Sequence, residues 1–298
     1  MLTAPDAQPV SMNSVIASLA KFSGFSGHVI PQIIRLTSDE SASAGDLARV
    51  LAHHPSLTAT VIRLANSSYY GRRCECTSIQ EAVTFLGFFS VRSLTLAASM
   101  SSIFKNDDDS GIKEALWNHS LATAVGARLV TKMSLPRLAE EAFLAGLMHD
   151  LAKLVLLQDY PEEYTPILRG ADGRNRSSLA REHFTFGIAH DQLGAMILED
   201  WGLPRLVIEV VRYHHSPDDP ALEGLPGDSK SVTQRLAHVV CFANSLAHAS
   251  GYAVCQAGEA DLSRIRSSEF LGYSSDMIES LQEELIHLVD QELSLFNH

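Results

Sequence analysis

The amino-acid sequence predicts an all-α protein, a multi-helical bundle preceded by a smaller N-terminal helical lobe. Apolar residues recur at three- and four-residue spacing through most of the 298 residues, which is the period of a helix with one buried face. Sustained alternation of apolar and polar residues, the pattern of a half-buried strand, is absent from the sequence. No glycine-rich turn joins a strand to a helix, so nucleotide-binding α/β folds are not expected.

Start and stop signals divide the sequence into helices. Pro55 fits the first position of one helix, and Ser78 and Glu81 have the spacing of a capping box at the start of the next. The apolar run from Ala82 to Ser99 is interrupted by an arginine, so we interpret it as two short helices and not as a membrane span. Further helices are expected over residues 112–132, 136–158, 190–201, 204–215 and 230–250.

The predicted organisation is an N-terminal extension over residues 1–22 followed by one region over 23–298. That region divides into a helical lobe over 23–105 and a larger lobe over 106–298. The charged run KNDDDS is predicted to link the two lobes, and residues 215–230 are predicted to form a surface loop. The amphipathic segment DMIESLQEELIHLVDQELSLF closes the larger lobe, where it can cap the bundle or meet a partner.

Composition excludes several classes of partner. The 23 lysine and arginine residues against 35 aspartate and glutamate residues give a net charge of −12, so nucleic acid is an unlikely partner. The first residues lack the basic and apolar pattern of a secretory signal, so we expect a cytoplasmic protein without a membrane partner. The four cysteines match neither a disulfide framework nor a paired zinc motif.

Histidine is the residue type that makes the sequence specific. His119 shares an inward helical stripe with Leu116 and Val130, and His149 shares one with Ala145 and Ala152. His190, His214 and His215 complete the set that we consider for a site. The more isolated histidines are expected at surface or cap positions: His28, His53, His183, His238, His287 and His298.

Asp150 follows His149 in an otherwise apolar stretch, and a buried carboxylate needs a partner. Two interpretations are open at this point. In the first, His119, His149 and Asp150 converge on a metal ion. In the second, Asp150 pairs with Lys153 or with His119, and nothing binds.

These residues carry a resemblance to a known family. HDLAK after an upstream WNHSLATA resembles the HD-domain superfamily of metal-dependent phosphohydrolases. More closely, residues 24–215 resemble the HDOD family, the signalling branch of that superfamily. The resemblance rests on an ordered series of segments: VIPQIIRL, DLARVLAHHPSLTATVIRLANSSYYG, SIQEAVTFLGFFSVRSLTL, LWNHSLATA, AFLAGLMHDLAKLVL, FGIAHDQLGAMILEDWGLP and VVRYHH.

The resemblance implies an HD-domain-like bundle and a set of metal ligands. His119, His149 and Asp150 match the first three ligands of the superfamily, and Lys153 matches the lysine that follows the pair in active members. His190, with His214 or His215, matches positions where two-metal relatives supply further histidines. The late aspartate aligns with Asn244, whose neutral oxygen is a poorer ligand than a carboxylate.

The function implied is that of a regulatory protein in bacterial signal transduction, non-catalytic or weakly catalytic, that binds a signalling partner, a small molecule or a nucleotide. A divalent ion (Fe, Mn, Ni, Zn or Mg) is its candidate cofactor. One alternative is a metal-dependent phosphohydrolase acting on a nucleotide or cyclic dinucleotide, with Lys153 steadying charge on the phosphoryl oxygens. Another is an oligomeric scaffold that self-associates through the C-terminal amphipathic helix.

One helix end also carries residues typical of a contact surface. The stretch LANSSYYGRRCECTSIQ places aromatic side chains beside arginines, a combination favoured at protein interfaces. The alternative is that the tyrosines cover the junction between the lobes. The candidate partner-binding residues are Asn66, Tyr69, Tyr70, Arg72 and Arg73.

Overall fold

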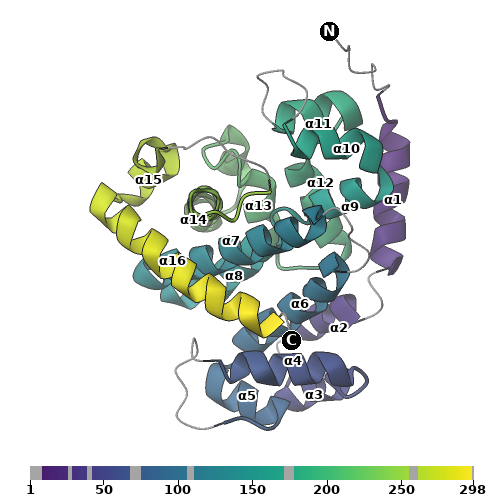
Figure 1. Ribbon diagram of the computed structural model, residues 1–298, viewed down its shortest axis with the longest axis vertical. Coiled ribbons are helices and arrows are strands. Elements are labelled where there is room, and N and C mark those ends of the chain that lie inside the picture. Colours follow the sequence, from purple (N-terminus) through teal and green to yellow (C-terminus); the bar gives the residue numbers. More distant parts are fainter. Residues whose placement is uncertain are drawn as a thin grey trace.

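The structure is a computed structural model that describes residues 9–25, 29–38, 42–67, 75–105, 111–170, 178–254 and 261–296. The described residues contain helices and no strand, so the all-α prediction is confirmed. Within this part of the chain, no helix is long and apolar enough to cross a membrane. The helices stack into one elongated body, with α3, α4 and α5 at one end and α10 and α11 at the other (Figure 1).

The first helices of the chain are α1 and those of the predicted smaller lobe. Their bounds are α1 (Met12–Phe25), α2 (Val29–Ser38), α3 (Ala44–Leu51), α4 (Pro55–Ala65), α5 (Ile79–Leu86) and α6 (Phe88–Lys105). The run from Ala82 to Ser99 is divided between two helices as predicted, and they meet at Gly87, which has φ 84°. Only α5 is short, because α6 has 18 residues and continues through Arg92. The predicted capping box is half formed, because Ser78 accepts from the Glu81 amide while the Glu81 carboxylate accepts from Thr77.

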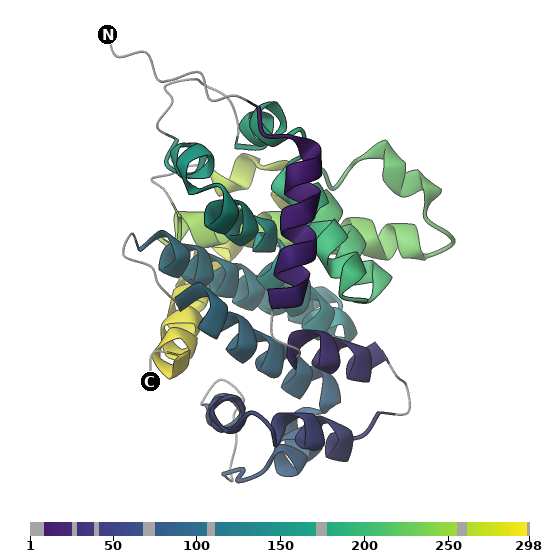
Figure 2. The ribbon, with the colours of Figure 1, turned by 90° about the vertical axis from the view of Figure 1, so that its right-hand side faces the viewer.

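The predicted N-terminal extension contains a packed helix. Although residues 1–8 lie outside the described part, α1 packs on α9 and α12 of the larger lobe (Figure 2). Val15 is fully buried there, and the Ser18 hydroxyl lies 3.2 Å from the Tyr160 hydroxyl. Residues 106–110 of the predicted linker also lie outside the described residues, so that prediction stays open.

The remaining helices belong to the predicted larger lobe. Their bounds are α7 (Ile112–Ser134), η2 (Pro136–Leu138), α8 (Ala139–Met148), α9 (Leu151–Asp159), α10 (Pro161–Leu168), α11 (Ser178–Phe186), α12 (His190–Asp200), α13 (Arg205–Tyr213), η3 (Pro220–Gly224), α14 (Ser229–Ala249), η4 (Leu262–Arg264), α15 (Arg266–Leu271) and α16 (Ser275–Phe296). The predicted loop over 215–230 includes the short helix η3.

The prediction of one helix over 136–158 is wrong. The chain forms a 3-10 turn and then α8 and α9, which are separated at His149 and Asp150. His149 is the C-cap of α8, and Asp150 precedes α9 with φ −106° and ψ 9°. The apolar period continues through the break, so the hydrophobic pattern alone does not reveal it.

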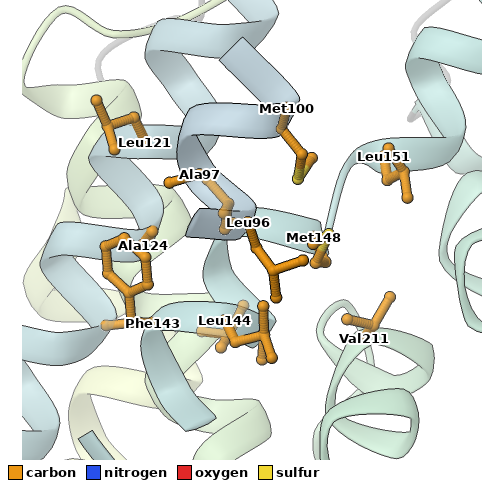
Figure 3. Packing of buried hydrophobic residues seen from close by; sticks show 14 of the residues in the cluster. Leu96, Ala97, Met100, Leu121, Ala124, Phe143, Leu144, Met148, Leu151 and Val211 are labelled. Atoms are coloured by element: carbon orange, nitrogen blue, oxygen red, sulfur yellow. The ribbon is translucent and has the colours of Figure 1, made fainter. Parts of the chain in front are cut away.

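Helix α7 is the centre of the lobe. It packs against α6, α8, α14 and α16, and nearly every residue from Leu116 to Thr131 is buried. The inward stripe predicted for this helix is correct but too narrow, because a central helix buries more than one face. On one side of α7, its apolar side chains pack against those of α6 and α8 (Figure 3).

The C-terminal helix caps the bundle. α16 runs along α7 and reaches α4 of the smaller lobe (Figure 1). Its buried residues follow the three- and four-residue spacing of one helical face: Ile278, Leu281, Leu285, Val289, Glu292 and Phe296. Glu292 is the polar member of this stripe, and burial raises the pKa of its carboxyl to about 7, although the charge of Arg128 lowers it.

Gly146→Ala should destabilise the protein because α8 crosses α7 very closely at this glycine. An added Cβ would lie 2.9 Å from both the Ala124 Cα and the Thr123 carbonyl oxygen, which are backbone atoms that cannot turn away. We expect the free energy of unfolding in urea to fall by about 1–3 kcal/mol. The matched control is Gly45→Ala in α3, where a Cβ meets only the Ser43 hydroxyl at 3.5 Å. An equal loss in both variants would contradict the close crossing.

Glu292→Gln should remove a pH dependence of stability. The folded-state pKa of about 7 lies above the ordinary 4.5, so the folded protein binds this proton more tightly than the unfolded chain. Relative to the glutamine variant, the wild type should therefore lose stability as pH rises from about 5 to about 8, by up to about 3 kcal/mol. Urea unfolding across that range measures the difference, and parallel profiles for the two proteins would refute the buried carboxyl.

Candidate metal centre

Four helix ends meet around the His149–Asp150 pair. His149 is the C-cap of α8, Asp150 is the N-cap of α9, His190 is the first residue of α12 and His214 is the C-cap of α13. His119 enters the cluster from the middle of α7. Helix ends leave backbone groups without partners inside the helix, and these groups can fix nearby side chains.

Three imidazoles are held by backbone carbonyls. The Nδ1 atoms of His119, His149 and His214 lie 2.9, 2.7 and 2.6 Å from the carbonyl oxygens of Tyr252, Gly146 and Val211. A carbonyl only accepts, so each Nδ1 carries a proton, and in the neutral ring this leaves the lone pair on Nε2. All three Nε2 atoms are buried and have no hydrogen-bond partner among the described residues.

The Asp150 carboxylate lies between the imidazoles. Its Oδ2 is 3.5 Å from the His119 Nε2 and 3.3 Å from the His149 Nε2. Its Oδ1 is 3.3 Å from the His190 Nε2, on the other side. The two carboxylate oxygens therefore face different histidines.

Lys153 pairs with the same carboxylate. Its ammonium lies 2.7 Å from the Asp150 Oδ2, as one of the two interpretations expected. Burial alone would raise the pKa of the Asp150 carboxyl, but the neighbouring His149 ring and the Lys153 ammonium hold it well below its usual range. Burial lowers the pKa of His119 and of His214 well below 6.5, so both imidazoles are neutral and can act as ligands.

A second group surrounds His190. Its Nδ1 lies 2.7 Å from a Glu182 oxygen, and its Nε2 lies 3.0 Å from the His215 Nε2. The other Glu182 oxygen accepts from the Tyr164 hydroxyl at 2.8 Å. Burial would lower the pKa of His190, but the Glu182 charge outweighs it and raises the pKa to about 9.

The donor atoms fit a metal ion. Those of His119, His149 and Asp150 lie within 4.8 Å of one another, and so do those of His190, His214 and His215. An imidazole whose far nitrogen is bound to a carbonyl or carboxylate is the usual form of a histidine ligand. All three residues of the first group are at most 1% exposed. In the second group, His190 and His214 are fully buried, while His215 is half-buried.

Sequence reasoning missed Glu182 and His248. The His248 ring centroid lies 4.5 Å from that of His119, and its buried Nδ1 has no partner in the described part of the chain. Asn244 lies one helical turn before His248 on the same face of α14, and its Oδ1 is also buried and unpaired there. The spacing of Asn244 and His248 on one helix was a usable signal, whereas no local pattern distinguishes Glu182.

Other predicted residues lie away from this cluster. The Asn66 amide bonds to both backbone groups of Cys76, and the other partner-binding candidates, Tyr69, Tyr70, Arg72 and Arg73, lie outside the described residues. The surface prediction for His238 is wrong, because its buried ring bonds to Asp218 and Ser267 and stacks on Phe270.

Comparison with known proteins decides the family. A family profile for the HDOD domain matches residues 26–217, which is more than half of the chain. The chain belongs to the HDOD family. The resemblance seen in the sequence is thus confirmed, and the HDOD match includes every histidine of the cluster except His248.

Relatives of this HDOD protein are distant in sequence. An uncharacterized protein of Treponema pallidum (strain Nichols) is 24% identical over 186 residues, which are 62% of this chain and only 36% of that protein. A structure from Shewanella amazonensis SB2B, provisionally assigned as a phosphohydrolase, has a TM-score of 0.68 at 20% identity and covers 94% of this chain and 97% of its own. One from Marinobacter aquaeolei VT8, provisionally assigned as a signal transduction protein, has a TM-score of 0.66 at 24% identity and covers 96% and 66%. These structures support the fold.

Lys153→Met should destabilise the metal-free HDOD protein. It removes the ammonium at 2.7 Å and leaves the buried Asp150 charge without its lysine partner. We expect a loss of about 3 kcal/mol in chelator-treated protein, measured by urea unfolding. Lys230→Met breaks a surface pair with Glu223 and should cost less than about 1 kcal/mol. Equal losses would mean that Lys153 does not compensate the buried charge.

Proposed function

We propose that this HDOD protein is a regulatory signalling protein that holds a divalent transition-metal ion and acts by binding a partner or ligand. One observation carries the proposal: three buried imidazoles present unpaired Nε2 atoms within the cluster that surrounds Asp150. The ion pair with Lys153 gives the Asp150 carboxylate a partner but leaves the three Nε2 atoms without one. Leaving three buried acceptors unpaired would cost about 1–3 kcal/mol each, and a metal ion would satisfy them.

His119, His149 and Asp150 would hold the ion, with His190, His214 and His215 as a second set of donors. Nitrogen-rich sets favour Zn, Ni or Fe over Mg and Mn, which prefer oxygen ligands. When bound, such an ion supplies Lewis acidity that polarises a phosphoryl oxygen. Burial keeps His119 and His214 neutral, and the three Nδ1 bonds orient the rings of His119, His149 and His214.

Burial favours regulation over turnover. The donors of the first group are at most 1% exposed, and structural metal sites are closed while catalytic sites keep an open position. One cavity, of about 280 Å³, is lined by residues of α13, α14 and the loop between them, and none of these belongs to the cluster. Asn244 of α14 has a neutral amide side chain, so it would supply no negative charge to a metal ion.

A metal-dependent phosphohydrolase remains the second candidate, and Lys153 favours it. Its side chain is 13% exposed, so the ammonium lies between the buried carboxylate and the surface. A cation in this position could steady charge on a phosphoryl group. The scaffold alternative has less support, because the apolar stripe of α16 is already covered by helices of the same chain.

The test measures metal content and hydrolysis in protein purified without chelators. We expect bound transition metal in the wild type and in His183→Ala, an exposed histidine of α11, and loss of that metal in His149→Ala. Phosphomonoesters and phosphodiesters supplied with Mn²⁺, Mg²⁺, Fe²⁺ or Ni²⁺ should not be hydrolysed. Absence of metal from the wild type would refute the metal centre. Turnover abolished by His149→Ala would establish the enzyme instead.

A further inference from the structure

We propose that the C-terminal helix α16 positions the His119 imidazole through Tyr252, so that docking of α16 regulates the metal centre. The inference rests on the proposed function, because it concerns one of the proposed ligands. It is carried by two hydrogen bonds: the Tyr252 hydroxyl donates to Asp290 of α16, and the His119 Nδ1–H donates to the Tyr252 carbonyl.

His119 differs from the other two carbonyl-bound histidines in the origin of its partner. His149 and His214 each bond to a carbonyl three residues earlier in their own helix. These two rings are fixed as soon as α8 and α13 form. The partner of His119 comes from Tyr252, 133 residues away, so the orientation of this ring depends on tertiary packing.

A glycine turn directs the Tyr252 carbonyl. After the C-cap Ser250, Gly251 has φ 91°, and its amide bonds to the His248 carbonyl at 3.2 Å. The Tyr252 amide bonds to the Ala247 carbonyl at 3.0 Å. This pair of bonds is the Schellman motif, which reverses the chain at the end of α14 and brings Tyr252 back toward α7.

The side chain of Tyr252 connects this turn to α16. Its hydroxyl donates to the Asp290 carboxylate at 2.9 Å. Burial and this bond raise the pKa of the Tyr252 phenol, so the hydroxyl remains a donor at neutral pH. A second tether joins the same two elements, from the Gln282 amide to the Ala249 carbonyl at 3.0 Å.

α16 contacts α7 on both sides of His119 along the helix. Its Phe296 ring lies 5.1 Å from the ring of Trp117, and its Leu285 packs beside Gly126. The same helix packs on α4 of the smaller lobe (Figure 1). A partner that binds the smaller lobe and shifts α16 would therefore change the support of His119 without touching the cluster.

The test uses the full chain and two measurements. Tyr252→Phe removes the hydroxyl and keeps the carbonyl. Weaker support of a histidine ligand should lower the affinity for Co²⁺, followed by visible absorbance, by roughly tenfold. In metal-free protein labelled with ¹⁵N-histidine, the His119 Nδ1–H signal should exchange faster with water. Asp290→Ala should reproduce both effects, while Asp290→Asn, which keeps an acceptor oxygen, should retain the wild-type values.

Tyr160→Phe is the matched control, since it removes a tyrosine hydroxyl that contacts a different helix, α1. It should leave the Co²⁺ affinity and the His119 signal unchanged. The inference is overturned if Tyr252→Phe changes only the melting temperature, as a purely structural contact would. If the wild type binds no Co²⁺, the proposed metal centre fails, and the exchange of the His119 Nδ1–H still decides whether α16 positions the ring.

Discussion

The buried charge of Asp150 is the constraint on which the rest of the larger lobe depends. A carboxylate that is 1% exposed would cost several kcal/mol without compensation. The fold surrounds it with the Lys153 ammonium and with imidazoles on both oxygens. Each of these groups must itself be held in place, so the requirement extends outward to the elements that carry them.

Helix ends hold some of the groups around Asp150 in place without any further element of structure. An uninterrupted helix would place adjacent side chains about 100° apart and would keep its carbonyls in the helix ladder. Ending α8 at Met148 frees the Gly146 carbonyl, which then accepts a hydrogen bond from the His149 Nδ1–H. The same arrangement recurs at the end of α13, where the Val211 carbonyl holds His214. The positions at which α8 and α13 end therefore determine how the His149 and His214 rings are oriented.

The sequence was informative where local physics decides the outcome. Helical spacing was sufficient to predict the fold class and the burial of His119 and His149, because both follow from the period of the helix. It failed at the break between α8 and α9, since the residues on both sides are equally apolar. It also failed for Glu182 and His238, whose burial depends on partners distant in the chain: His190 for one, and Asp218 and Ser267 for the other.

The two sides of the cluster are built from different parts of the chain. The HDOD match ends at residue 217, and it includes both histidines whose carbonyl partners are local. The residues that face His119 from α14, and the turn that holds its ring, come after that limit. One side of the cluster is thus fixed by helices of the HDOD domain, whereas the other depends on how a later segment docks. If α16 shifted as proposed, the charge compensation would persist, because Lys153 belongs to α9 and would stay beside Asp150. The proposed metal centre would then lose only the alignment of His119.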